Sequence, residues 1–190
     1  MSNITKHALS GALKKLLSKH ALTAITVQNI VDEAGVSRKT FYYHFRDIYD
    51  LTEWTMQEEF QKILAGNQTL DTWQQGVKNL LDYIIENKNL ILNLVLSLDD
   101  DFITEELREV VKPLMLSVYQ ELPGFRQLSE DDQQFFSMVQ IYGCIGVLLD
   151  WIREGMQIPQ DVILARFVHY FSLASQFLGA SPDPDPASGD

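Results

Sequence analysis

Residues 26–47 read TVQNIVDEAGVSRKTFYYHFRD, and this stretch decides the fold of the N-terminal part of the chain. Thr26 is a favourable N-cap residue, and the apolar residues that follow it at helical spacing predict a short helix. Gly35 stands where a helix commonly ends in a left-handed residue, and Ser37 can cap the next helix. The stretch therefore predicts two short helices joined by a tight turn.

The second of these helices has two different faces. Phe41, Phe45 and Ile48 recur at i, i+4 and i+7, which predicts a stripe packed against the core. The remaining positions carry polar side chains, with His44 toward the flank: Arg38, Lys39, Thr40, Tyr42, Tyr43, His44 and Arg46. No acidic residue lies between Glu33 and Asp47, whereas a solvated helix face usually mixes both signs of charge. A helix-turn-helix that binds DNA is favoured over an ordinary helical hairpin.

A longer stretch, ITVQNIVDEAGVSRKTFYYHFRDIYDL (residues 25–51), resembles the N-terminal domain of TetR/AcrR-type transcriptional regulators. The family motif appears here in order as Thr40, Tyr42, His44, Phe45, Arg46 and Asp47. The run FRDIYDLTEW (residues 45–54) is also similar to regulators grouped with dihydroxyacetone-kinase operons. The motif covers the first 50 residues or so, and the rest of the chain matches the family only in size and helical character.

The resemblance implies a dimer that reads a palindromic operator with a recognition helix over residues 38–45. The implied DNA contacts are Thr26, Gln28, Arg38, Lys39, Thr40, Tyr42, Tyr43, His44 and Arg46. Arginine or lysine can donate to guanine, and threonine or tyrosine suits a phosphate or a thymine methyl group. The helix start at Thr26 and Gln28 is expected to hold a backbone phosphate, because helix N-termini bind anions.

Charge is distributed unevenly along the chain. The formal net charge is −11, which by itself argues against DNA. Residues 1–50, however, carry seven basic and four acidic side chains, a net charge of +3, and the remainder carries −14. Because ordinary salt screens charges beyond about 10 Å, a locally basic head can still bind phosphate. The single cysteine, Cys144, excludes an intramolecular disulfide framework and fits a reducing cytoplasm.

Helical patterns continue throughout the chain without a convincing strand, so we expect an all-α protein. Its expected parts are a helix-turn-helix DNA-binding domain (1–48), an all-helical regulatory and dimerisation domain (49–180) and a disordered tail (181–190). The helices expected over 129–155 and 158–178 are apolar on more than one face. TetR-like proteins pair two such helices with their copies, so we expect a homodimer here, with an ordinary core as the alternative.

We expect the helical body to control DNA binding. Whether the protein represses or activates transcription stays open. The first hypothesis is a ligand-responsive repressor; the alternatives are an activator controlled by a protein coactivator, and a helical protein-interaction module without DNA binding. Aromatic side chains that could line an effector pocket are Trp54, Trp73, Tyr83, Phe102, Tyr119, Tyr142 and Trp151. The effector itself cannot be named from sequence.

Other functions find little support in the sequence. The chain has no glycine-rich phosphate loop, nucleophile elbow or Cys/His ligand pair, so we expect neither an enzyme nor a cofactor. The acid run at 99–101 suits a helix N-terminus better than a metal site. No uninterrupted apolar run reaches about 18 residues, so we expect no membrane span and a cytoplasmic protein.

Overall fold

The computed structural model describes residues 2–179, and every regular element in that range is helical. The expected all-α fold is confirmed. In chain order the elements are α1 (Ser2–Leu17), the 3-10 turn η1 (Leu22–Ala24), α2 (Val27–Ala34), α3 (Arg38–His44), α4 (Ile48–Leu64), α5 (Trp73–Glu86), α6 (Lys88–Val95), α7 (Asp100–Tyr119), α8 (Pro123–Gln127), α9 (Glu130–Arg153) and α10 (Gln160–Gly179). The tail predicted for 181–190 lies outside the described residues.

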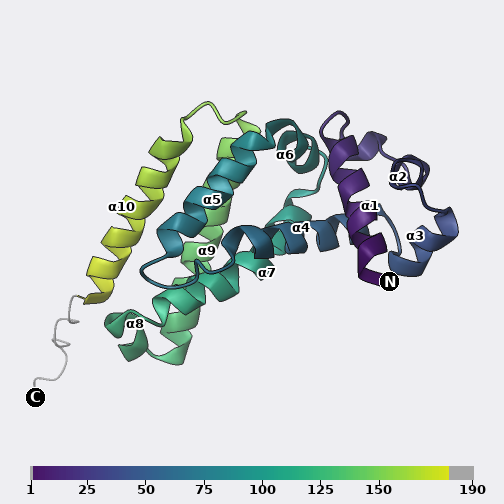
Figure 1. Ribbon diagram of the computed structural model, residues 1–190. Coiled ribbons are helices and arrows are strands. Elements are labelled where there is room, and N and C mark those ends of the chain that lie inside the picture. The colour runs from purple at the N-terminus through teal and green to yellow at the C-terminus, as the bar shows by residue number, and fades with distance from the viewer. Residues whose placement is uncertain (1, 180–190) are drawn as a thin grey trace, which may run out of the picture.

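Helices α1, α2 and α3 form a head at one end of the molecule, and the longer helices form a body at the other (Figure 1). The head is built on fully buried side chains from all three helices, among them Leu9, Leu13, Ile30 and Phe41. Apolar burial of this kind stabilises a small helical unit by about 25 cal/mol for each Å² removed from water. These side chains fix α3 from behind, and they belong to one continuous core that extends through α4 into the body.

Helix α4 connects the head to the body (Figure 1). The Asp47 side chain caps it by accepting from the Asp50 amide at 2.9 Å, as an N-cap residue should. In its first half, the Trp54 ring packs on Phe45 of the head, with ring centroids 5.9 Å apart, and on His7 at 5.1 Å. Trp54 is therefore part of the packing between α4 and the head.

In the body, α9 packs along α7 and α6, whereas α10 lies at the outer edge against α5 and α8 (Figure 1). The buried side of α9 includes Ile141, Ile145 and Leu149, and the indole of Trp151 donates to the Ile158 carbonyl at 2.8 Å. By length and composition α9 could also cross a membrane. Core helices of soluble proteins can have the same length and composition. The sequence contains no uninterrupted apolar run at this position, so the expectation from sequence did not single out α9.

Candidate nucleic-acid interface

The turn between α2 and α3 has the backbone geometry that its residues predict. Thr26 caps α2 by accepting from the Asn29 amide at 3.2 Å, and Asn29 accepts in return from the Thr26 amide at 2.9 Å. This reciprocal arrangement is a capping box, whose second member the sequence analysis did not identify. Gly35 ends α2 at φ 67°, a left-handed conformation that glycine adopts without steric cost. Helix α2 is therefore fixed at both ends.

Helix α3 is held on the head by its aromatic residues and by its cap. Ser37 accepts from the Thr40 amide at 3.1 Å, and the two hydroxyl groups are 2.8 Å apart. Phe41 is 0% exposed and Phe45 is buried beside it, as the i, i+4 spacing predicts. The Thr40 side chain is half-buried, so its hydroxyl is engaged within the turn more than it is presented outward.

The opposite face of α3 is open to solvent. Arg38 lies one turn from Tyr42, with the guanidinium 3.4 Å from the phenol oxygen, so the two side chains form one surface. Lys39 is exposed beside them, and Tyr43 is 80% exposed. His44 is half-buried and its ring meets the Tyr43 ring edge-on at 4.9 Å. This face of α3 therefore presents two tyrosines and two cations together to solvent.

Other predicted contacts lie at the edges of this face and already have partners. The Gln28 amide group donates to Asp32 at 2.7 Å. The Arg46 side chain is exposed, and its Nε lies 3.4 Å from the Asp50 carboxylate. Such a long, solvent-exposed ion pair holds a side chain only weakly. Arg46 therefore remains available to a stronger anion such as phosphate.

Lys14 and Lys15 of α1, and Lys19 just beyond its end, do not form a single surface. Lys14 points toward the body, where its Nζ lies 2.9 Å from Glu59 of α4, and Lys15 pairs with Glu33 of α2. Lys19 has no ion-pair partner among residues 2–179. Lys14 is therefore engaged between α1 and α4 and is not part of the exposed cationic face of α3.

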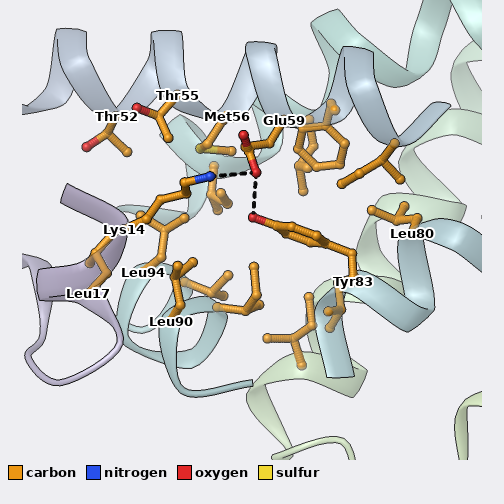
Figure 2. Close-up of a pocket in the computed structure, with 18 of the residues that line it drawn as sticks. Lys14, Leu17, Thr52, Thr55, Met56, Glu59, Leu80, Tyr83, Leu90 and Leu94 are labelled. Carbon is orange, nitrogen blue, oxygen red and sulfur yellow. Dashed lines mark hydrogen bonds and ion pairs between the residues drawn. The ribbon is translucent and has the colours of Figure 1, made fainter. Parts of the chain in front are cut away.

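Glu59 stands at the junction between head and body (Figure 2). Besides Lys14 it accepts from the Tyr83 hydroxyl of α5 at 3.1 Å. Burial tends to raise the pKa of Glu59, but hydrogen bonds and charge attraction, chiefly from Lys14, outweigh burial and lower it. Burial and the Glu59 carboxylate together raise the pKa of Tyr83, so its hydroxyl stays protonated. These three side chains form what we call the junction bridge.

An apolar cavity of about 70 Å³ adjoins the junction bridge, and a second cavity of about 150 Å³ lies deeper in the body. Of the aromatic residues proposed for a pocket, Tyr83 lines the first cavity, and Trp73 and Tyr119 line the second. The others serve packing or lie at the surface. Cys144 also lines the second cavity, where burial raises its pKa to about 11 and keeps the thiol protonated.

The acid run at 99–101 has a structural role. Asp99 caps α7 by accepting from the amides of Asp101 and Phe102, and Asp100 pairs with Arg153 at 2.6 Å. Within residues 2–179, no cluster of three or more His, Cys, Asp or Glu side chains could hold a metal ion.

An exposed apolar stripe runs along the outer sides of α9 and α10. It consists of Phe135, Met138, Val139, Tyr142, Val147, Val162, Tyr170, Leu173 and Phe177. Gly143 and Gly146 lie within it on α9, with open space beside each. Exposed apolar side chains gathered along two helices are typical of a surface that packs against a partner.

The fold and its exposed cationic helix define a helix-turn-helix DNA-binding protein. Residues 9–53 match the family model described as bacterial regulatory proteins, tetR family, and residues 71–172 match the model of a transcriptional regulator C-terminal region. The chain belongs to the tetR family of bacterial regulatory proteins and is a DNA-binding transcriptional regulator, not an enzyme. Members of the family bind DNA operators and dimerise.

Individual relatives agree with this family. The chain is 31% identical over 87 residues to the HTH-type dhaKLM operon transcriptional activator DhaS of Lactococcus lactis subsp. lactis (strain IL1403), an alignment that spans only 46% of each protein. The solved structure titled dihydroxyacetone kinase operon activator DhaS has a TM-score of 0.69 at 19% identity, over 92% of this chain and 97% of that one. A TetR transcriptional regulator from Streptococcus agalactiae 2603V has a TM-score of 0.59 at 21% identity, over 92% and 94%. Both solved structures have the same fold as this chain.

Proposed function

We propose that this protein is a homodimer that reads a palindromic operator with α3 and releases or holds it according to a signal received by the body. The observation that carries the proposal is the outward face of α3. Arg38, Lys39, Tyr42 and Tyr43 are exposed there together, while Phe41 is buried beneath them. A rigid helix with cations and aromatic groups on one side suits the major groove of DNA.

Each predicted contact has a role that follows from its position. Arg38 and Lys39, at the start of α3, are placed to donate to base edges, because recognition helices read bases with their N-terminal residues. Tyr42 and Tyr43 supply phosphate or thymine-methyl contacts. Arg46 exchanges its weak pairing with Asp50 for a backbone phosphate.

The remaining predicted contacts act from the edges of the helix. The start of α2, with Thr26 and Gln28, accommodates a second phosphate. Thr40 and His44 are half-buried and contribute mainly by fixing the helix against the turn. We therefore rank them below the four exposed residues of α3 as direct DNA contacts.

We infer a division into a DNA-binding domain (1–48) and a regulatory and dimerisation domain (49–180). The start of α4 at Ile48, directly after the three helices of the head, supports this boundary. We further infer that α9 and α10, in the regions predicted at 129–155 and 158–178, pair with their copies across the exposed apolar stripe. Burial of that stripe is the expected driving force, because it is apolar along two helices. A regulator of chromosomal DNA is expected in the cytoplasm.

We propose a ligand-responsive repressor. The cavity beside the junction bridge supports control by a ligand, because helices of both head and body line that cavity. A ligand there would shift operator binding by its differential affinity for two placements of the head. The second candidate is an activator controlled by a protein coactivator, favoured by the relative described as a transcriptional activator.

A mobility-shift titration against the DNA upstream of the protein's own gene tests DNA reading. Lys39→Ala should weaken binding by roughly tenfold or more, since one base or phosphate contact is lost in each half-site. Lys78→Ala, an exposed lysine of α5 in the body, is the matched control and should leave affinity unchanged. Equal affinity for wild type and Lys39→Ala, with helicity intact, would contradict the site.

A reporter under the same operator separates the two signs of control. Deletion of the regulator should raise reporter expression if the protein represses. A fall in expression would replace the repressor proposal by the activator.

A further inference from the structure

The first cavity lies between the head and the body. Leu13 and Leu17 of α1 form one wall, and side chains of α4, α5, α6, α7 and α9 form the others. Figure 2 shows Met56 and Glu59 of α4 opposite Tyr83 of α5, with Leu90 close to the end of α1. Its lining is mostly apolar, so the interior offers a dry environment for an apolar group.

Thr55 is a polar exception in this lining. It is 6% exposed, and its hydroxyl has no hydrogen-bond partner within residues 2–179. Thr52, also on the cavity wall, satisfies its hydroxyl by donating to the Ile48 carbonyl at 2.8 Å. A buried hydroxyl without a partner costs about 1–3 kcal/mol, so a site that keeps one gains by supplying a partner from outside the chain. Thr55 lies one helical turn from Glu59, on the side of α4 that lines the cavity.

The charges at the rim are already paired with one another. Glu59 pairs with Lys14 at 2.9 Å and with Lys62 at 3.3 Å, and Tyr83 adds a neutral hydroxyl. A cationic ligand would be repelled by Lys14 and an anionic one by Glu59, and either would have to lose hydration in an apolar site. A neutral hydroxyl can donate to the carboxylate and accept from Lys14 or Thr55 without leaving a charge unpaired.

The size of the cavity limits the apolar part of a ligand. Its volume of about 70 Å³ is roughly half that of a 150 Å³ protein cavity that admits benzene, which suits a chain of about three or four carbon atoms. A polar surface groove of about 450 Å³ adjoins it and shares Lys14, Tyr83 and Leu90 with its lining. This groove gives a path for entry at the junction bridge.

We propose that this cavity binds a small neutral alcohol, with its short apolar chain among the leucines and its hydroxyl beside Thr55 and Glu59. The bound alcohol contacts α1 of the head and α4 of the body together, so it favours one placement of the head relative to the body. That consequence for operator binding rests on the proposed function, whereas binding of the alcohol does not.

The test is a titration of the full-length protein, without DNA, followed by methyl NMR of its leucine and isoleucine residues. Three probes share one skeleton and differ in charge: butan-1-ol, butylammonium and butyrate. Butan-1-ol should shift the methyl signals of Leu13 and Ile84 saturably, and the two ions should not. Equal saturable shifts with all three probes, or none with butan-1-ol, would overturn the proposal.

Two isosteric variants locate the hydroxyl. Thr55→Val should weaken butan-1-ol binding about fivefold, which corresponds to the loss of one neutral hydrogen bond. Thr52→Val is the matched control, because its hydroxyl already has a partner, and affinity should stay unchanged. Equal effects of the two variants would overturn the assignment to Thr55.

The same probes then separate this site from the proposed function. If butan-1-ol binds as expected and also changes the affinity for the operator, the alcohol site and ligand control of DNA binding are both supported. If it binds and operator affinity does not change, the alcohol site stands and ligand control through it is refuted.

Discussion

Replacement of Glu59 by glutamine should destabilise the protein, because it removes the acid on which the junction bridge depends. The side chains of Lys14 and Glu59 are 31% and 17% exposed, so the pair is neither a surface pair nor a fully buried one. Exposed pairs contribute about 0–1 kcal/mol, and breaking a buried pair costs about 3–5 kcal/mol. We expect a loss of about 1–2 kcal/mol in the free energy of unfolding, or a fall of about 2–8 °C in Tm for a domain of this size.

Thermal unfolding followed by circular dichroism, at one fixed protomer concentration, measures this loss. The pH dependence gives a second check, because the folded-state pKa of Glu59 is lowered from its ordinary 4.5. The stabilisation should be complete above that ordinary value and disappear as the pH falls through the lowered pKa. Glu109→Gln, on the exposed side of α7, is the control and should not change Tm. A Tm for Glu59→Gln equal to that of wild type at neutral pH would refute the reasoning.

Further predictions concern the turn and the dimer. Gly35→Ala should destabilise the protein by about 1–2 kcal/mol in urea titrations, since alanine resists a positive φ. Gly11→Ala, within α1 and with open space around it, should instead stabilise by about 0.5–1 kcal/mol; equal effects would contradict the assigned turn. Val139→Asp should convert a dimer into a monomer in light scattering at micromolar protein, whereas Ser117→Asp on α7 should not. A wild-type protein that is monomeric in this measurement would contradict the proposed interface.

The head could be predicted from sequence because its decisive interactions are local. The cap at Thr26, the left-handed Gly35 and the cap at Ser37 each join residues no more than four positions apart. The alternation of Phe41 and Phe45 with cationic residues likewise follows from the helical repeat. Even here Asn29 was missed, although its place three residues after the cap was the available signal.

The junction could not be predicted in the same way. Lys14 and Glu59 are 45 positions apart, and no periodicity indicates that α1 and α4 bring them together. Aromatic residues at helical spacing gave no sign of which would pack and which would line a cavity, since both environments favour large apolar groups.

Photo-crosslinking from α3 tests the central claim most directly. A benzoyl-phenylalanine at position 43, in place of the highly exposed Tyr43, should crosslink to both half-sites of the operator. The same group in place of Phe177, near the far end of α10, is the control and should not crosslink to DNA (Figure 1). Crosslinks from position 43 alone are the result that the proposed interface predicts. Crosslinks from position 177, with none from position 43 on DNA that the protein still binds, would contradict it.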